Sequence, residues 1–305
     1  MPRIVAVVWA TATGKTDLGE ALAEALGGEL VCADSRQVFR ELEVGTGKPA
    51  PADRAARPHH LFDALVLGQR PSAGWYAKAV GAVCGAIHSR GRTPVLVGGS
   101  GLWLRAAQHG LSGEPPHDPE VRARLQAELE RDGPELLHAR LALADPATAA
   151  RLSPRDRQRV TRALEVHEAS GRPLSWWHER QGEPAATGEW AVFELTLPPQ
   201  ALDERIARRT RWMFDSGLVE ETRALVAAGH EAPLRALRAV GYDEVLELLA
   251  GRSDRRAAEE RTNLRTRQLA KRQRTWFRHQ VEAVRLASTG GGVADPLREI
   301  LRRLR

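Results

Sequence analysis

The sequence is poor in cysteine and has no long apolar segment. Its 305 residues include only two cysteines, Cys32 and Cys84, each far from a second cysteine or a suitably spaced histidine. This argues against a disulfide framework and against a zinc site. No segment approaches the roughly 20 apolar residues of a membrane span, and the apolar start at Ile4–Val8 is too short for a signal sequence. We therefore expect a cytoplasmic protein that does not enter a membrane.

Basic residues, by contrast, are in excess. The chain has 45 Lys and Arg against 39 Asp and Glu, which gives a net charge of +6. Its 42% hydrophobic residues are typical of a soluble globular protein, and its length allows one large domain with an insertion, or two domains. The positive charge favours a polyanionic partner. A solvated Arg-rich surface without such a partner would give the same totals.

Short apolar runs alternate with helical patterns along the chain. Strands are expected at 4–8, 30–33, 93–97 and 191–197, and helices at 15–26 and 77–88. This alternation predicts the α/β class, with a parallel sheet covered by helices on both faces. Ligands bind such sheets at the carboxyl ends of the strands.

The middle of the chain differs from the rest. From about Pro115 to His178 the sequence is helical and charged and has no strand pattern. We therefore predict a helical insertion domain at 115–186, within a core domain formed by 1–114 and 187–305. After the strand at 191–197 we expect helices to the end, with turns at Gly217, Gly229–Pro233 and Gly251. The run Gly290–Gly292 and the Arg-rich tail are expected to be frayed.

A phosphate-binding turn joins the first strand to the first helix. The residues Trp9-Ala-Thr-Ala-Thr-Gly14-Lys15-Thr16 resemble a P-loop, in which main-chain N–H groups surround a phosphate. Lys15 would neutralise that phosphate, and Thr16 would bind a magnesium ion. The predicted fold is therefore a P-loop NTPase-like sheet. The pattern has glycine where this chain has Trp9, so we expect Trp9 to distort the turn, narrow the pocket or lower activity.

The position of the nearest carboxylate argues against nucleotide hydrolysis. A P-loop ATPase needs an acid at the end of a later central strand, but the strand at 93–97 ends in Gly98-Gly99-Ser100-Gly101. The acid instead ends the second strand, at Asp34. This favours a site that holds a diphosphate while a nucleophile is deprotonated nearby. By itself, Asp34 could equally be a capping carboxylate.

Eight segments together resemble the tRNA dimethylallyltransferase (isopentenyltransferase) family, in its order and at its spacing, over roughly residues 4–278. They are the P-loop, Asp34–Phe39, Gly45–Pro49, Pro58–Asp63, Val97–Gly101, Asp156–Val166, Gly241–Glu244 and Ala270–Arg278. The chain departs from the family pattern at Trp9 (usually Gly), Ala10 (usually Pro), Gly47 (usually Ala) and Ser100 (usually Thr).

The resemblance implies an activity: transfer of a dimethylallyl group from dimethylallyl diphosphate to N6 of the adenine next to a tRNA anticodon (tRNA position 37). The tRNAs would be those that read codons beginning with U. Asp34 would be the general base, Ser100 would hydrogen-bond nearby, and Arg209 would be an added cation on the diphosphate. Arg205, one turn earlier, could be a second such cation or part of a solvated face. The diphosphate would be bound by Thr11, Ala12, Thr13, Gly14, Lys15 and Thr16, with Mg²⁺ as the cofactor.

The resemblance also assigns contacts with the anticodon stem-loop of tRNA. They are Asp34, Ser35, Arg36 and Gln37; Gln158, Arg159, Val160, Thr161 and Arg162; Arg238, Ala239, Val240, Gly241, Tyr242 and Asp243; and Lys271, Arg272, Gln273, Arg274, Thr275, Trp276, Phe277 and Arg278. The insertion domain would grip the stem, and the adenine would leave its stack and enter a channel. We expect the protein to act as a monomer.

Two basic clusters suit a phosphate backbone. Residues 261–278 contain seven Lys or Arg and no acid. The second cluster consists of the arginines at 151, 155, 157, 159 and 162, and Asp156 is the only acid expected to balance their charge. Solvated helix faces remain the alternative. Trp276 and Phe277 could stack on a base or pack in the core.

Other interpretations stay open. His59-His60 could be a metal pair, although we favour a packing role, because adjacent histidines do not easily face one ion. The P-loop alone would suit a small-molecule kinase, and the same prenyl chemistry would suit an adenylate isopentenyltransferase that acts on free AMP. A non-catalytic RNA-binding protein is the remaining alternative.

Overall fold

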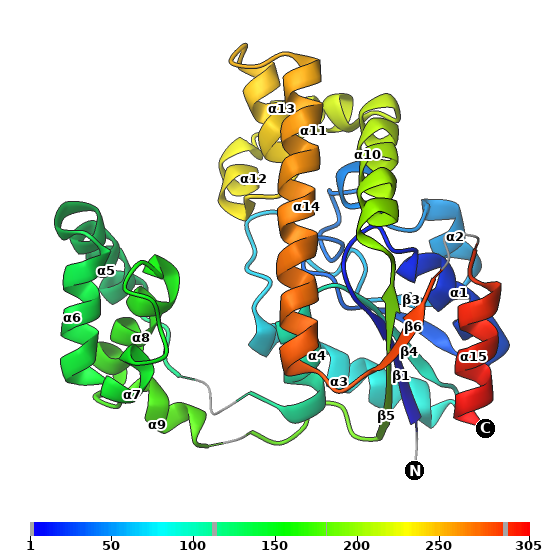
Figure 1. The fold of residues 1–305 in the computed structure, drawn as a ribbon, viewed down its shortest axis with the longest axis horizontal. Helices are drawn as coiled ribbons and strands as arrows, with labels where there is room; N and C mark the ends of the chain where they lie inside the picture. Colours follow the sequence, from blue (N-terminus) through cyan, green and yellow to red (C-terminus); the bar gives the residue numbers. More distant parts are fainter. Residues whose placement is uncertain (1–2, 112–114, 181, 289–291) are drawn as a thin grey trace. The chain divides into compact units, whose positions relative to one another are not determined.

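A computed structural model describes residues 3–111, 115–180, 182–288 and 292–305. The chain divides into two compact units (Figure 1). The first, here called the core unit, consists of residues 1–108 and 185–305. The second, here called the insertion unit, is His109–Pro184.

A six-stranded sheet forms the centre of the core unit, and every neighbouring pair of strands is parallel. The strand order is β3-β2-β4-β1-β5-β6. The strands are β1 (Arg3–Val8), β2 (Glu29–Cys32), β3 (His59–His60), β4 (Pro94–Gly98), β5 (Glu189–Thr196) and β6 (Val284–Ala287). The α/β class and the four expected strands are confirmed. The two edge strands, β3 and β6, were not expected.

Helices cover both faces of this sheet or lie beyond the carboxyl ends of its strands (Figure 1). They are α1 (Lys15–Ala25), α2 (Pro51–Ala56), α3 (Ala73–Ser89), α4 (Gly101–His109), α10 (Pro199–Asp215), α11 (Leu218–Ala227), α12 (Glu231–Leu237), α13 (Tyr242–Leu249), α14 (Arg255–Gln280) and α15 (Ala294–Leu304), with a short 3₁₀ turn, η1 (Val44–Thr46). Both expected helices are present. The turns at Gly217 and Gly251 are present too, but the one at Gly229 is shorter than expected, because α12 begins at Glu231 with Pro233 in its first turn.

The C-terminal region differs from the expectation in two ways. The chain after β5 is not helical throughout, because β6 adds to the edge of the sheet beside β5. The Arg-rich tail is not frayed either: it forms α15, whose Pro296 and Ile300 are buried. Apolar residues at helical spacing give α15 a face for the core, while Arg302 and Arg303 pair with Glu299. Gly290 and Gly291 lie outside the described residues.

The insertion unit is helical in the part that the structure describes. Its helices are α5 (Pro119–Asp132), α6 (Pro134–Ala144), α7 (Pro146–Ala149), α8 (Arg157–Ser170) and α9 (Leu174–His178). Leucines of α5, α6 and α8 form a hydrophobic core of its own. The fully buried carboxylate of Glu165 is neutralised by Arg122 and Arg162. These contacts give the unit independent packing.

The sheet register brings three chain turns to one edge. Val8 at the end of β1 pairs with Gly98 at the end of β4, and Cys32 at the end of β2 pairs with Val97. The turns that follow these strands, at residues 9–14, 33–37 and 99–101, therefore lie side by side. Helices α10 and α14 stand above this edge (Figure 1). None of the described helices is long and apolar enough to cross a membrane.

Candidate active site

A cavity of about 1040 Å³ opens at this edge of the core unit. The P-loop forms its floor, and the turns after β2 and β4 and the loop Gly45–Ala50 add to its walls. Helices α10 and α14, with the segment Arg238–Tyr242, supply the rest. Its size lies at the upper end of the range for ligand sites, about 300–1,000 Å³.

The P-loop wraps around the start of α1. Gly14, at φ 89°, is the residue before the helix, and Ala12 also has a positive φ, of 63°. The Thr13 hydroxyl and the Lys15 ammonium both donate to the carbonyl of Ala10, at 3.0 and 2.6 Å. Because α1 begins at Lys15, its first N–H groups have no partner within the helix and face the cavity. The turn thus presents donors and a cation to an anion.

Burial changes the electrostatics of Lys15. Desolvation lowers the pKa of its ammonium from 10.5 to about 8, although the nearby Asp34 carboxylate opposes the shift. Arg209 lowers the pKa further by charge repulsion. Two cations therefore lie close together beside one carboxylate, and an anion bound here would relieve their repulsion.

Asp34 follows β2 and is held by its own turn. Its Oδ1 accepts from the main-chain N–H of Arg36 at 2.9 Å, while Oδ2 has no hydrogen bond to any residue that the structure describes. Only Oδ1 of Asp34 thus has the capping role that the sequence allowed. The Ser100 hydroxyl accepts from the N–H of Ser35 at 2.9 Å, which fixes the next residue of the turn. Asp34 lines the cavity, and its second carboxylate oxygen is not used by the turn.

Two arginines of α10 lie over the P-loop. Arg209 donates to the Thr11 hydroxyl and to the carbonyl of Thr46, both at 2.7 Å. Burial lowers the pKa of its guanidinium, and Asp34 raises it. Arg205 reaches Gly14: its Nη2 lies 3.2 Å from where a Cβ of that residue would be. The fold therefore brings together Asp34, Ser100 and Arg209, the three predicted catalytic residues.

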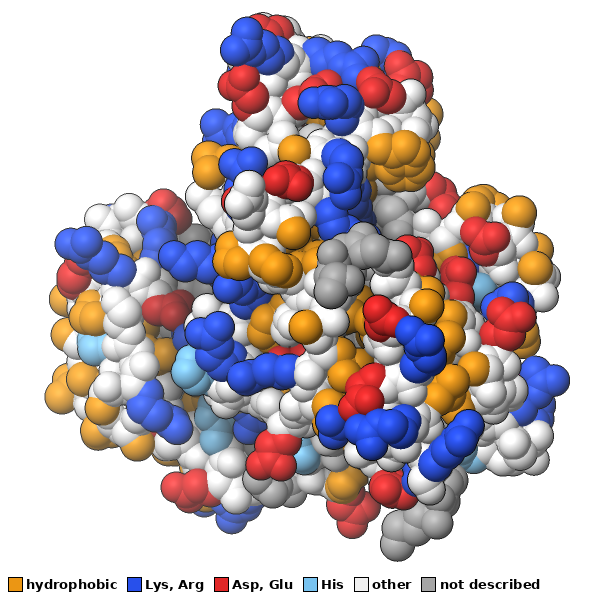
Figure 2. Space-filling view, turned by 45° about the vertical axis from the view of Figure 1, so that its right-hand side comes forward, with side chains coloured by type: hydrophobic (Ala, Val, Ile, Leu, Met, Phe, Trp, Pro, Cys, Tyr) orange, Lys and Arg blue, Asp and Glu red, His pale blue; other side chains and the backbone are white. Residues whose placement is uncertain are grey.

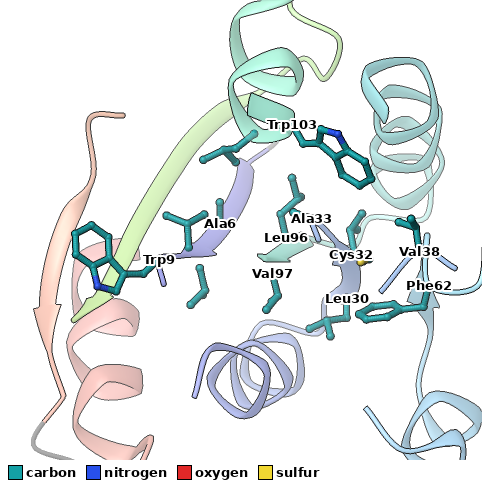
Figure 3. Packing of buried hydrophobic residues seen from close by; sticks show 14 of the residues in the cluster. Ala6, Trp9, Leu30, Cys32, Ala33, Val38, Phe62, Leu96, Val97 and Trp103 are labelled. Atoms are coloured by element: carbon teal, nitrogen blue, oxygen red, sulfur yellow. The ribbon is translucent and has the colours of Figure 1, made fainter. Parts of the chain in front are cut away.

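Trp9 does not narrow the cavity. Its side chain is 4% exposed, does not line the cavity, and packs against Phe277 with ring centroids 6.1 Å apart. Figure 3 shows its ring among buried hydrophobic residues. The main chain at Trp9 still has the positive φ, 136°, that glycine adopts easily. Such strain costs about 1–3 kcal/mol, and the burial of the indole ring offsets it.

Helix α14 is fastened to the P-loop by Gln273. Its Oε1 accepts from the N–H of Thr11 at 2.9 Å, and its Nε2 donates to the carbonyl of Gly99 at 3.0 Å. Phe277 is 1% exposed, and Trp276 lies so close to Gly101 that a Cβ there would come within 2.0 Å of its ring. Phe277 is therefore a core residue, and Trp276 packs the helix against the turn after β4.

The predicted site residues fall into three groups. Those lining the cavity are Thr11, Ala12, Gly14, Lys15, Thr16, Asp34, Ser35, Arg36, Gln37, Ser100, Arg209, Arg238, Ala239, Val240, Tyr242, Arg272 and Gln273. Those of the core unit outside its lining are Thr13, Gly241, Asp243, Lys271, Arg274, Thr275, Trp276, Phe277 and Arg278. Gln158, Arg159, Val160, Thr161 and Arg162 belong to the insertion unit, where the side chains of Val160 and Thr161 are buried and serve packing.

Some lining residues were not predicted. Helix α14 contributes Thr262, Arg265, Thr266, Gln268 and Leu269. Several of them precede Gln273 at helical spacing, which is the signal that would have found them. Helix α10 adds Trp212 and Met213 in the same way, on the face that carries Arg209.

The two basic clusters differ once their partners are known. In the insertion unit, Asp156 is not the only acid that balances the charge of the arginine cluster, so that prediction was wrong. Acids from α5, α6 and α8 also form pairs: Arg155–Glu135, Arg157–Glu130 and Arg162–Glu165, with Arg159 on Asp156 itself. On α14, by contrast, Arg261, Lys271, Arg272 and Arg274 have no ion pair with any described residue. In Figure 2, Lys and Arg side chains are interspersed with Asp and Glu over the lobe formed by α10–α14.

The histidine pair has a packing role. The ring of His59 packs edge-on against Phe62, with centroids 5.5 Å apart, and His60 bonds the buried Glu29. In the described part of the chain no three His, Cys, Asp or Glu side chains cluster as metal ligands would.

A parallel sheet with a P-loop after its first strand, and a carboxylate after its second, defines a P-loop NTPase-like fold. The model of the IPP transferase family matches residues 37–280, and that of isopentenyl transferases matches residues 2–59. The chain belongs to the IPP transferase family.

Named proteins support this assignment. The tRNA dimethylallyltransferase of Halorhodospira halophila is 46% identical over 288 residues, covering 93% of each chain. The crystal structure of the tRNA isopentenylpyrophosphate transferase of Bacillus halodurans superposes with a TM-score of 0.72 at 31% identity, covering 100% of this chain and 96% of that one. A eukaryotic dimethylallyltransferase acting on tRNA has the same fold, with a TM-score of 0.81 at 22% identity, covering 100% of this chain and 78% of that one.

Proposed function

We propose that this protein transfers a dimethylallyl group from dimethylallyl diphosphate to N6 of an adenine beside the anticodon of tRNA. The observation that carries the proposal is that Asp34 and the Lys15 turn share one cavity, with cations around it. The relatives named as tRNA dimethylallyltransferases support it across nearly the whole chain.

The diphosphate would lie on the P-loop. The N–H groups at the start of α1, with Lys15, Arg205 and Arg209, offer donors and positive charge for its oxygens. A magnesium ion fits this site through the Thr16 hydroxyl, because Mg²⁺ commonly takes one or two protein ligands and completes its shell with phosphate oxygens and water. When bound, the ion would neutralise charge on the leaving diphosphate.

Asp34 would act on the nucleophile. The N6 amine is weak because its lone pair is delocalised into the ring. As N6 bonds to C1 of the dimethylallyl group, the C1–O bond to diphosphate breaks and the N6 proton passes to Oδ2 of Asp34. A positioned base of this kind contributes about 10²–10⁴-fold to the rate. Ser100 positions the turn through the N–H of Ser35.

The RNA would approach over α10 and α14. The adenine must leave its stack to reach Asp34, and the cavity volume admits a purine and the donor together. We propose that the adenine is the one at tRNA position 37, in tRNAs reading codons that begin with U. We also propose that the protein works as a monomer in the cytoplasm, and that the insertion unit contacts the anticodon stem.

Labelled dimethylallyl diphosphate tests the proposal. We expect transfer of label to unmodified tRNA with adenines after the anticodon, and none to free AMP. Transfer to AMP instead would identify an adenylate isopentenyltransferase. Consumption of ATP without label transfer would identify a kinase, and tight tRNA binding without either activity would identify a non-catalytic RNA-binding protein.

A further inference from the structure

Trp212 stands apart from the other tryptophans of this chain. The sequence has eight. Six have a ring contact with another aromatic side chain, and Trp190 donates a hydrogen bond to Ala186. Trp212 has neither a ring contact nor a hydrogen bond within the described residues, and it is 53% exposed. A single exposed apolar side chain is ordinary on a protein surface, so the case for Trp212 rests on where it lies and on the charges beside it.

The position of Trp212 on α10 makes it part of the cavity wall. Trp212 lines the cavity from α10, three residues after Arg209 and seven after Arg205. At 1.5 Å per residue, the helix carries it about 10 Å along the axis from Arg205. That distance is larger than a five-carbon chain extending from a diphosphate on the P-loop. Trp212 thus marks the part of the wall beyond the donor.

The charges around Trp212 indicate what covers it. Arg208 and Arg211 lie on the same helix, are exposed, and form no ion pair with any residue in the described ranges. Many other exposed arginines of this protein, such as Arg252, Arg255 and Arg256, are paired with acids. An indole on the same helix as two unpaired guanidinium groups fits a nucleic acid strand, whose bases stack while its phosphates meet the cations.

We infer that Trp212 is a stacking site for an unpaired base of the RNA, next to the adenine that enters the cavity. This rests on the proposed function and adds a specificity-determining residue to it. Every base has a stacking face. The site therefore recognises any unstacked base beside the adenine, whatever hydrogen-bonding groups that base carries. It therefore favours an open loop over a duplex.

Kinetics of Trp212→Ala test the inference. We expect the KM for tRNA to rise about 5- to 150-fold, the loss typical of one stacked base. The kcat and the KM for dimethylallyl diphosphate should stay the same, and Trp212→Phe should recover most of the loss. The salt dependence of tRNA binding should keep its slope, because no cation is removed. Leu264→Ala is the matched control, since Leu264 is equally exposed, at 53%, and lies outside the cavity lining.

Abasic loops identify the partner. In anticodon stem-loops with one base removed at a time, removal of the stacking base should weaken wild-type binding and have no effect on Trp212→Ala. Equal losses in both proteins at every position would overturn the inference. So would an unchanged KM for tRNA, or a raised KM for the donor, which would place the prenyl chain against Trp212. Absence of transfer by the wild-type protein would instead refute the proposed function.

Discussion

Lys15 is a cation whose charge depends on pH near neutrality. Burial lowers the pKa of its ammonium to about 8, so the free site loses that charge as the pH rises through 8. A diphosphate prefers the protonated form and raises the pKa when it binds.

We therefore predict that kcat/KM for dimethylallyl diphosphate falls by about tenfold per pH unit above pH 8. The pH profile of Lys15→Met should be low and lack this step. A wild-type profile that stays flat to pH 10 would show that the Lys15 charge does not bind the donor.

The sequence predicts which chemistry a residue can perform better than it predicts where its side chain points. Lys15 and Asp34 could be placed from the sequence, because a strand followed by a turn fixes where each residue lies. The direction of Trp9 could not be predicted: a glycine position in a motif indicates the required φ but not where a larger side chain would go. The structure turns that side chain into the core, against Phe277.

Helix α14 has two different faces. One face carries unpaired cations, and the other packs on the P-loop and the turn after β4 through Gln273, Trp276 and Phe277. Gln273 satisfies one main-chain donor and one acceptor. Each group left unsatisfied when buried costs about 1–3 kcal/mol.

Gln273→Leu removes both hydrogen bonds. We predict a higher KM for dimethylallyl diphosphate, because the N–H of Thr11 loses its partner and the P-loop loosens. Gln268→Leu, on the same helix but without these hydrogen bonds, is the control. Equal donor KM values for the two variants would show that Gln273 does not position the loop.

Element prediction succeeded where patterns were long. The buried runs that form β1 and β4 are bounded by Gly or Pro, so their strands were found. β3 has only two residues, too few for periodicity to separate from noise. β6 is as long as β2, but it lacks the continuous buried run that marks β2, because only Leu286 of its four residues is buried. The tail that forms α15 was expected to be frayed because it is rich in arginine. Its structure is determined instead by the apolar residues at helical spacing around Ile300.

The whole molecule carries its positive charge unevenly. Several arginines of the insertion unit are paired with acids, whereas Arg208 and Arg211 on α10 and Arg261, Arg272 and Arg274 on α14 have no ion pair with any described residue. These pairings depend on tertiary contacts, which is why the sequence alone suggested two equivalent basic clusters. A polyanion should therefore be attracted mainly to the core unit.

Reversing two of these charges tests this distribution. We predict that Arg272→Glu with Arg274→Glu weakens tRNA binding and flattens its salt dependence by about two phosphate contacts. Arg298→Glu, at an exposed arginine paired with Asp295 on α15, should leave the slope unchanged. Identical slopes for the double variant and the wild type would remove this surface of α14 from the RNA interface.

The role of Asp34 as the base is tested most directly by single-turnover prenyl transfer to tRNA by Asp34→Asn. Asparagine keeps the acceptor for the N–H of Arg36 but cannot take the N6 proton. The account predicts that this variant binds tRNA and dimethylallyl diphosphate as tightly as the wild type and transfers the prenyl group about 10²–10⁴-fold more slowly. Transfer at the wild-type rate would contradict it.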